Sequence, residues 1–588
     1  MEKPTLKYKR ALKKRRKLFF GEGELSSLSD ILQRMKKFYS GRDCIAEKEG
    51  KRLLVHSVDD FYLDVEAVSS YLIKKKLQKS HIAIVGENSY AWPVTFFAVT
   101  CIGAVAVPID KELTDAEIET LFKKGDCDAL FFSRTYKKVA EKLKSGKNLP
   151  CVCLSAKGGE GFESFCDIIE EEKRSIALNG FDAANFSAKP DDPAAIVFTS
   201  GTTGENKGVV LTHRNFASNV EGVLGAVEPV YSVMSVLPMN HTYELSCSVL
   251  SALCLGAVLY INDSLRHFSA NLFQFKPEAM ASVPLLADNI YENIIKTAEK
   301  QGKLPSLKKA VFVSEKLLKI GIDLRKPLFA SVRKSFGYRF PMISVGGAPV
   351  NGERARFLSL LGFNVIIGYG LTEASPIVSI NNEVLKNSES VGKCVKHTEF
   401  KILSPNGDGV GEIAIRGNNV FSGYYKDEKA TAASFCDGWF LTGDYGKKDK
   451  NGNLYITGRK KNLIILDNGK NIYTEVLEAY FTENCPFIKE CVVLEHTRVA
   501  DGESVKILAL AASVKEGFFE ESVGGEELLE TVSAEVYRLN ESLPSYKRIA
   551  DVMAVRHEFE KTSTMKIIRR KVEEEYEKYT DLREKSHA

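Results

Sequence analysis

Residues 194–209 read Ala-Ala-Ile-Val-Phe-Thr-Ser-Gly-Thr-Thr-Gly-Glu-Asn-Lys-Gly-Val. The apolar start is typical of a short buried strand, and the polar remainder is typical of a loop. Glycines let backbone N–H groups approach an anion closely, hydroxyl groups donate further hydrogen bonds, and Lys207 supplies positive charge. This composition predicts a phosphate-binding loop but is also compatible with an ordinary polar loop. The candidate phosphate-binding residues are Thr199, Ser200, Gly201, Thr202, Thr203, Gly204 and Lys207.

Strands of the same kind alternate with helical segments on both sides of this loop. The segments His81–Val85, 105–108 and Ala129–Phe132 have strand character, and a helix is expected from Thr114. The alternation resumes at residue 194 and continues to about residue 380. This is the βαβ pattern of a parallel sheet covered by helices, so we predict an α/β fold.

Two windows, Trp92–Ile109 and Leu245–Asn262, each run about 18 residues without a charged side chain, which is close to the length of a membrane-spanning helix. Both are interrupted by nearly the same residues, Cys101-Ile-Gly-Ala-Val and Cys254-Leu-Gly-Ala-Val. A glycine there is typical of a helix end, and the Val-rich run after it is typical of a buried strand. We therefore expect two similar helix–turn–strand units in a soluble core.

The charges are unevenly distributed along the chain. It has 81 Lys and Arg against 77 Asp and Glu, which gives a net charge of +4. Residues 1–20 hold nine basic side chains and one acid, so the rest of the chain sums to −4. A slightly acidic body with dispersed charges disfavours a nucleic-acid partner. The basic segment is either a solvated tail or a contact to anionic lipid or to an acidic carrier protein.

The twelve cysteines are scattered, and no two of them form a Cys-x-x-Cys pair. This spacing disfavours a metal cluster and favours a reducing compartment. The basic start is not followed by a long apolar run, so we expect no secretory signal. We expect a cytoplasmic protein, with residues 1–20 as a candidate contact to the inner surface of the membrane.

Six further motifs, together with the loop at 199–209, resemble the adenylate-forming (AMP-binding) enzyme superfamily, which includes acyl- and aryl-CoA synthetases. They occur in the family's order, and the resemblance extends from about residue 50 to 570. The motifs are Leu237-Pro-Met-Asn-His-Thr-Tyr, Gly346-Gly-Ala-Pro, Tyr369-Gly-Leu-Thr-Glu-Ala, Trp439-Phe-Leu-Thr-Gly-Asp, Tyr455-Ile-Thr-Gly-Arg-Lys-Lys and Lys561-Thr-Ser-Thr-Met-Lys.

The resemblance implies a large N-terminal domain with two parallel-sheet α/β subdomains and a small β-barrel-like subdomain, plus a small mobile α+β C-terminal domain. The expected boundaries are a basic segment at 1–20, the adenylate-forming domain at 21–460 and the C-terminal domain at 461–588, with a hinge at Lys461. Short strands with Gly, Asn and Asp turns place the barrel-like subdomain at 390–457.

The resemblance also implies a two-step reaction. ATP converts a carboxylate to an acyl-adenylate and releases pyrophosphate, and a thiol then displaces AMP. The first step crowds negative charge onto phosphate oxygens and needs Mg²⁺, which prefers oxygen ligands. By resemblance, Glu373 helps to hold Mg²⁺ and Thr372 donates a hydrogen bond to phosphate. Lys566 would stabilise charge that develops during adenylation.

Other positions follow from the same motifs. Tyr369, with Gly370 after it, would stack on adenine, and His241 would lie near the nucleotide and the mouth of the acyl pocket. Asp444 suits a ribose diol because a carboxylate only accepts hydrogen bonds, and Arg459 suits the same sugar and the nearby phosphate. The residues expected on the other side of the adenine are Gly347, Ala348 and Pro349.

Two stretches indicate which acid is activated. Residues 282–291 and 463–473 are similar to long-chain acyl-CoA synthetases, and the uncharged stretch near 245–259 fits an apolar acyl tunnel, although it also fits plain core. We expect a medium- to long-chain fatty acid as substrate and coenzyme A as acceptor, with Gly469 near the pantetheine entrance. Acyl carrier protein is the alternative acceptor. An aryl-acid ligase and an inactive binding scaffold are the alternative functions.

Overall fold

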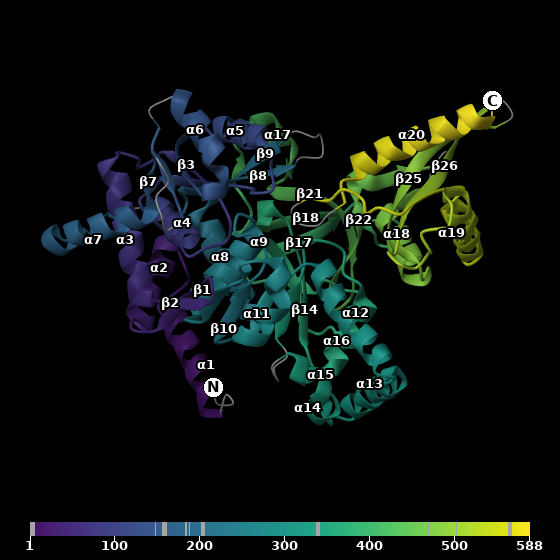
Figure 1. The fold of residues 1–588 in the computed structure, drawn as a ribbon, viewed down its shortest axis with the longest axis horizontal. Coiled ribbons are helices and arrows are strands. Elements are labelled where there is room, and N and C mark those ends of the chain that lie inside the picture. Colours follow the sequence, from purple (N-terminus) through teal and green to yellow (C-terminus); the bar gives the residue numbers. More distant parts are fainter. Residues whose placement is uncertain are drawn as a thin grey trace. The chain divides into compact units, whose positions relative to one another are not determined.

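The computed structural model describes residues 6–146, 149–155, 161–182, 185–186, 188–200, 206–336, 341–466, 470–500, 503–562 and 567–587 (Figure 1). The chain divides into two compact units. Unit 1 comprises residues 1–400 and 415–440, and unit 2 comprises residues 401–414 and 441–588.

An eight-stranded sheet in unit 1 carries the hairpin that flanks the phosphate loop. Its central strands are parallel, whereas β8 and β9 pair antiparallel and β19 pairs antiparallel with β9. In order across the sheet, the strands are β19 (Gly423–Tyr424), β9 (Asn206–Thr212), β8 (Pro193–Ser200), β4 (Val105–Ile109), β3 (His81–Val85), β5 (Cys127–Phe132), β6 (Cys151–Cys153) and β7 (Glu163–Ser164).

A nine-stranded sheet carries most of the other motifs. Its central strands, from β14 to β1, are parallel, and antiparallel strands close both edges. In order, the strands are β16 (Lys393–Cys394), β15 (Ile377–Asn381), β14 (Asn364–Gly370), β13 (Met342–Val345), β12 (Ala279–Ser282), β10 (Ser232–Ser235), β11 (Val258–Ile261), β1 (Asp43–Glu49) and β2 (Arg52–Ser57).

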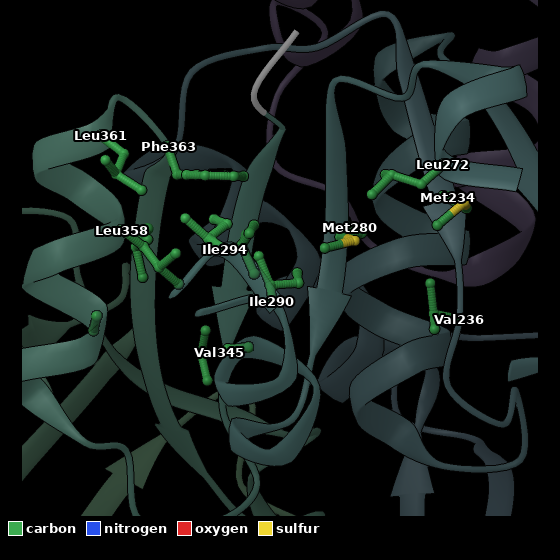
Figure 2. Packing of buried hydrophobic residues seen from close by; sticks show 14 of the residues in the cluster. Met234, Val236, Leu272, Met280, Ile290, Ile294, Val345, Leu358, Leu361 and Phe363 are labelled. Carbon is green, nitrogen blue, oxygen red and sulfur yellow. The ribbon is translucent and has the colours of Figure 1, made fainter. Parts of the chain in front are cut away.

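Helices cover these sheets and bury apolar side chains against them. Figure 2 shows Ile290 and Ile294 of α12 and Leu358 and Leu361 of α16 gathered around Val345 of β13. The main helices of unit 1 are α1 (Leu6–Phe20), α2 (Leu28–Tyr39), α3 (Val58–Lys74), α4 (Ala91–Cys101), α5 (Asp115–Lys124), α6 (Lys137–Gly146), α7 (Phe165–Asn179), α8 (His213–Ala226), α9 (Thr242–Glu244), α10 (Ser251–Leu255), α11 (Phe268–Phe275), α12 (Pro284–Lys300), α13 (Leu304–Lys319), α14 (Arg325–Leu328), α15 (Ala330–Ser335), α16 (Gly352–Leu361) and α17 (Glu428–Ala433).

The two uncharged windows form helix–turn–strand units, as predicted. Helix α4 leads through Gly103, with φ +80°, into β4, and α10 leads through Gly256, with φ +58°, into β11. A Cβ at Gly256 would lie 2.8 Å from the Tyr39 ring, so a larger residue does not fit there. No helix among the described residues is long and apolar enough to cross a membrane.

The third sheet has five strands and corresponds to the predicted barrel-like part. Its order is β17 (Thr398–Leu403), β18 (Gly411–Gly417), β21 (Trp439–Lys448) and β20 (Phe435–Cys436), with β22 (Leu454–Arg459) also paired to β21. Two further groups of strands belong to unit 2. They are the hairpin of β23 (Leu463–Ile465) and β24 (Asn471–Tyr473) and a sheet of β25 (Ile488–Ala500), β26 (Glu503–Val514) and β27 (Asp551–Val555). The five-stranded sheet draws its residues from both units. The helices of unit 2 are α18 (Thr474–Asn484), α19 (Gly525–Asn540) and α20 (Arg569–His587).

The basic N-terminal segment is helical over Leu6–Phe20. Phe19 is fully buried and stacks on Tyr39, with 5.6 Å between the ring centroids. Arg16 donates hydrogen bonds to the backbone carbonyls of Leu224 and Val227 at the end of α8. The C-terminal half of α1 therefore packs on unit 1 through specific contacts.

Candidate active site

The carboxyl ends of parallel strands gather several motifs at one edge of the nine-stranded sheet. Strands β10, β12, β13 and β14 are mutually parallel neighbours. Residues 237–241 follow β10, residues 346–349 follow β13, and Tyr369 lies at the end of β14. Ligands of open α/β sheets bind at this edge, and the predicted adenine and acyl-pocket residues of unit 1 follow strands that end there.

Close backbone packing explains two of the motif glycines. A Cβ at Gly346 would lie 3.1 Å from the carbonyl oxygen of Gly368, in the adjacent strand. A Cβ at Gly370 would lie 1.9 Å from the carbonyl oxygen of Pro376, which no other residue could accommodate. The first contact places Gly346 beside Gly368, the residue that precedes Tyr369.

The predicted phosphate-binding loop comes between β8 and β9 in the sequence. Thr199 pairs with Lys207 and Ser200 pairs with Asn206, so the described residues form the base of a hairpin. The candidate residues Gly201, Thr202, Thr203 and Gly204 lie outside the described residues. The Lys207 ammonium lies 5.0 Å from the centroid of the Tyr424 ring.

Tyr424 connects this lysine to the predicted metal ligand. Its hydroxyl donates a 2.9 Å hydrogen bond to Oε1 of Glu373. Burial, reinforced by the Glu373 carboxylate, raises the pKa of Tyr424 above its ordinary value, so the phenol stays protonated and keeps donating. Tyr424 reaches this position because β19 pairs with β9, with Tyr424 opposite Val209. Lys207, Tyr424 and Glu373 thus form one cluster within unit 1.

Two buried asparagines hold the turn that carries Thr372 and Glu373. Asn219 on α8 and Asn419 are both fully buried, and each donates hydrogen bonds to the carbonyl oxygens of Ala374 and Ile377. The four donor–acceptor distances range from 2.8 to 3.1 Å. Because two amides donate to the same two carbonyl oxygens, the turn is rigid, and this rigidity holds the backbone of Glu373 in place.

His241 lies between the two parallel sheets. Its Nε2 is 3.6 Å from Oδ2 of Asp110, which directly follows β4 of the eight-stranded sheet. Asn88, three residues after β3, accepts from the Met239 N–H at 2.9 Å and donates to the Leu237 carbonyl at 2.7 Å. These contacts fix the 237–241 loop against the carboxyl edge of the eight-stranded sheet.

Glu244 is a buried carboxyl beside this loop. It is fully buried and accepts a hydrogen bond from the Val236 N–H at 3.1 Å. Burial raises the pKa of Glu244 to about 7. A π-helical turn, Leu245–Leu250 (η3), begins at the next residue, and such turns are frequent near functional sites.

Unit 1 contains an apolar cavity of about 40 Å³. Its walls come from α8, the η3–α10 segment and strands β12 to β15. A cavity of this size holds a few water molecules at most, so a long chain needs side chains to move. The residues that line it include Leu224, Cys247, Leu255, Met280, Ser344, Ile366, Gly368 and Ile377.

In unit 2, Asp444 and Arg459 face each other across neighbouring strands. They are a cross-strand pair of β21 and β22, and Nε of Arg459 lies 3.4 Å from Oδ1 of Asp444. Asp444 is buried, and its N–H donates to the Thr442 hydroxyl at 3.1 Å. The two residues that the sequence assigned to one sugar therefore lie together.

The predicted hinge residue Lys461 also lies in unit 2, in a short turn after β22. Glu475 on α18 holds this turn, since it accepts from the Arg459 N–H at 3.3 Å and from the Asn462 side chain at 2.5 Å. Burial and the guanidinium groups of Arg459 and Arg569 lower the pKa of Lys461.

Two predicted residues, Gly469 and Lys566, lie outside the described residues. On either side of Lys566, Lys561 and Ile567 form an isolated antiparallel bridge. Nζ of Lys561 lies 2.9 Å from Glu490 and 2.6 Å from Glu558. The described residues around Lys566 are thus held to the body of unit 2.

Comparison with known families identifies the chain. The AMP-binding enzyme model matches residues 44–425, and the AMP-binding enzyme C-terminal domain model matches residues 461–582. The chain belongs to the AMP-binding enzyme family. The resemblance predicted from the six motifs and the phosphate loop is confirmed.

Relatives of this AMP-binding enzyme include acyl-CoA ligases of bacteria and mammals. It is 30% identical over 453 residues to long-chain-fatty-acid–CoA ligase FadD15 of Mycobacterium bovis, and the aligned region covers 72% of each chain. It is 28% identical over 523 residues to long-chain-fatty-acid–CoA ligase 5 of Mus musculus, covering 81% of this chain and 75% of the relative.

Solved structures show the same fold. ATP-bound MatB from Rhodopseudomonas palustris superposes with a TM-score of 0.72 at 20% identity, over 93% of this chain and 99% of the other. An ATP-bound RpMatB–BxBclM chimera gives a TM-score of 0.73, also at 20% identity, over 94% and 99%. The predicted α/β fold, with two largely parallel sheets and a small additional sheet, is confirmed.

Several residues of this site were not predicted from the sequence. Tyr424 does not belong to any of the sequence motifs. Its role arises only from the pairing of β19 with β9, which brings it to the site. Asn219 and Asn88 likewise act through contacts with residues more than a hundred positions away. One usable signal was Asn219, which lies close to the apolar residues Ala217 and Val220 on α8, because a buried amide needs hydrogen-bond partners.

Proposed function

We propose that this AMP-binding enzyme activates a medium- to long-chain fatty acid with ATP and transfers the acyl group to a pantetheine thiol. In the first step the carboxylate oxygen attacks the α-phosphorus and pyrophosphate leaves. In the second step the thiol sulfur attacks the acyl carbon and AMP leaves. The relatives named as long-chain-fatty-acid–CoA ligases support this chemistry, as do the described motif residues.

The observation that carries the choice of acid is the apolar cavity. Gly368, which directly precedes the expected adenine residue Tyr369, is among the residues that line it, and the lining is mainly aliphatic. Met280 also lines the cavity, and because a methionine side chain is unbranched and adaptable, it can move aside for a longer chain. An aliphatic tail fits such walls better than a charged or polar acid does.

The unit 1 cluster fits the triphosphate and its metal. Thr372 offers a hydroxyl and Glu373 a carboxylate, both only partly buried, and hard cations prefer such oxygen ligands. Glu373 would hold Mg²⁺, which supplies charge neutralisation at the phosphate oxygens when bound. Lys207 and the residues of the 199–204 loop would bind phosphate. Tyr424 orients the Glu373 carboxylate through its hydrogen bond.

The remaining assignments rest on the family resemblance. Tyr369 and Gly370, with Gly347, Ala348 and Pro349, would enclose the adenine. His241 would lie at the acyl entrance, where the Asp110 contact orients its ring. In unit 2, Asp444 and Arg459 would bind the ribose, Lys461 would act as the hinge of a C-terminal domain at 461–588, and Lys566 would stabilise the adenylation transition state.

Coenzyme A is the acceptor that we propose, with Gly469 near the pantetheine entrance. Acyl carrier protein presents the same pantetheine arm on an acidic surface, and the basic face of α1 would suit it. The two acceptors therefore need a direct comparison with the same acyl-adenylate.

Residues 1–20 are proposed to contact the anionic inner surface of a membrane. Arg10, Lys13, Lys14 and Lys17 on α1 are exposed, whereas Arg16 points inward. Nζ of Lys13 lies 3.2 Å from Glu228, which lines the apolar cavity. Replacing Lys14 and Lys17 by Glu, which leaves these anchoring contacts intact, should weaken vesicle binding at low salt and spare adenylation.

An ATP–pyrophosphate exchange panel tests the proposal. The full-length enzyme is assayed with Mg²⁺ and linear acids of increasing length, and with benzoate as an aryl acid. Exchange that rises with chain length supports the fatty acid, and exchange with benzoate alone supports an aryl-acid ligase. The absence of any acid-dependent exchange would mean an inactive scaffold. Thioester formation with coenzyme A or with carrier protein then identifies the acceptor.

A further inference from the structure

A second strongly basic segment lies far from the N terminus. Residues 303–334 hold nine Lys and Arg and only two acids, a net charge of +7. Without this segment and residues 1–20, the rest of the chain sums to −11. The segment forms α13, α14 and α15, which lie at the lower edge of unit 1 in Figure 1.

The same segment concentrates exposed apolar side chains. Eighteen large apolar residues are exposed among the described residues, and six of them fall within residues 312–328. They are Phe312 (58% exposed), Val313 (37%), Ile320 (69%), Ile322 (44%), Leu324 (44%) and Leu328 (37%). Single exposed apolar residues are ordinary, but a cluster of this size marks an interaction surface.

The segment is anchored, so the exposed side chains are a fixed feature of the fold. Leu307, Ala310 and Val311 pack against the core of unit 1, and the buried Ser314 donates to the Leu360 carbonyl at 3.1 Å. Further along, Phe329 is 1% exposed. One face of α13 is thus part of the core, and the opposite face presents Lys308, Phe312 and Lys316 at helical spacing.

Both acids of the segment are already paired with cations. Glu315 lies 3.0 Å from Lys319 and 3.2 Å from Arg356, and Asp323 lies 2.8 Å from Arg325. The exposed lysines therefore make the electrostatic potential at this surface positive. The exposed cations are Lys303, Lys308, Lys309, Lys316, Lys319, Lys326 and Lys334.

We infer that the α13–α15 surface, residues 303–334, docks onto an anionic lipid bilayer. Its apolar side chains enter the headgroup region while the surrounding lysines pair with lipid phosphates. An acidic protein would match the charges, but the interleaving of bulky aliphatic residues with lysines favours an interface that is both apolar and anionic. The segment belongs to the connection between β12 and β13, two strands that line the apolar cavity, with α12 preceding it in the same connection.

Vesicle co-sedimentation of the full-length protein tests this inference. The probes are vesicles of phosphatidylcholine alone and of phosphatidylcholine with phosphatidylglycerol in equal parts. Lys308→Glu/Lys309→Glu should lower the partition coefficient on anionic vesicles roughly tenfold or more. Phe312→Ser/Ile320→Ser should remove the binding that survives high salt, because that part is apolar. Ile320→Ser alone, at the most exposed position, should show a smaller loss in the same direction.

Matched controls lie elsewhere on unit 1. Arg134→Glu/Lys138→Glu makes the same charge change at exposed positions near α6, and Leu63→Ser/Leu178→Ser removes two exposed leucines on α3 and α7. Both controls should bind as the wild type does.

Equal losses in controls and test variants would overturn the docking surface, and so would wild-type binding by the test variants. A loss confined to binding of purified acyl carrier protein would also overturn it and assign the surface to a protein partner. Exchange with a water-soluble acid should be unchanged in every variant, which separates this inference from the proposed activity.

Discussion

The hydroxyl of Tyr424 donates a 2.9 Å hydrogen bond to Oε1 of Glu373, while the Lys207 ammonium lies 5.0 Å from the centre of the same tyrosine ring. One side chain therefore contacts both the lysine of the β8–β9 hairpin, which is proposed to bind phosphate, and the carboxylate proposed to hold Mg²⁺. The two motifs are 166 positions apart in the sequence and belong to different sheets of unit 1.

Removal of the Tyr424 hydroxyl should weaken use of the metal–ATP complex. Tyr424→Phe keeps the ring beside Lys207 but removes a hydrogen bond to a charged group, which is typically worth about 1.5–3 kcal/mol. We expect the KM for Mg²⁺–ATP in the exchange assay to rise roughly ten- to a hundredfold, with a smaller change in kcat. Tyr425→Phe is the matched control, because its hydroxyl donates to the exposed Asp126 at 2.6 Å. Equal kinetics of the two variants would contradict the role of Tyr424.

Gly368→Val should shorten the acids that the enzyme accepts. A Cβ at Gly368 meets only Ile377 Cδ1, at 3.7 Å, so the backbone tolerates the change while the added methyl groups fill the cavity. Exchange with long-chain acids should fall roughly ten- to two-hundredfold relative to short acids, since the fit of a single methylene is worth about 1–3 kcal/mol. Gly225→Val, outside the cavity on α8, should keep the wild-type preference. A parallel loss for short and long acids would contradict this cavity as the acyl site.

Glu244 should make stability fall as the pH rises. Its pKa in the folded protein is about 7, against an ordinary value of 4.5, so the unfolded chain releases the proton first as the pH rises. The neutral carboxyl favours the folded state fully below about pH 4.5, and this contribution is lost between there and pH 7, on the order of 3 kcal/mol in total. Glu244→Gln keeps a carbonyl acceptor for the Val236 N–H but does not titrate.

The thermal unfolding midpoint, measured between about pH 5 and pH 8, tests this prediction. The wild type should lose more stability over this range than Glu244→Gln does. Glu299→Gln, at an exposed position on α12, should behave like the wild type. A wild-type slope in Glu244→Gln would show that other groups cause the pH dependence.

Lys566→Ala should separate the two half-reactions. If Lys566 stabilises charge only during adenylation, the variant loses ATP–pyrophosphate exchange by about a hundredfold or more, as is typical when a preorganised charge is removed from a transition state. Thiolysis of a supplied acyl-adenylate by coenzyme A should remain near the wild-type rate. Lys571→Ala on α20 is the control, since its nearest acid, Glu560, is 3.8 Å away at the surface. Retained exchange in Lys566→Ala would refute the assignment.

Local chemistry made much of the fold predictable. The Gly103 and Gly256 turns lie at helix ends as their sequence neighbours indicated, and Thr114 caps α5 through a reciprocal bond with Glu117. Asp444 and Arg459, assigned to one sugar, are indeed cross-strand partners.

Long-range pairing was not predictable in the same way. Strand β1 joins the nine-stranded sheet through Ile45 opposite Leu259, and no local pattern near residue 45 indicates that partner. The Tyr424 contact depends on a two-residue strand, and the Asn219 and Asn419 clamp depends on two amides from distant segments that share acceptors. The α13–α15 surface was not predicted either, because the sequence does not show that its lysines and apolar residues are exposed together.

The proposed activity is tested by the stoichiometry of the products that the enzyme forms from a long-chain fatty acid. The full-length enzyme is incubated with the acid, ATP, Mg²⁺ and coenzyme A, and the nucleotides and thioester are quantified by mass spectrometry. The account predicts equal amounts of AMP, pyrophosphate and acyl-CoA, all dependent on the acid. Formation of ADP in place of AMP, or AMP formation that does not depend on the acid, would contradict it.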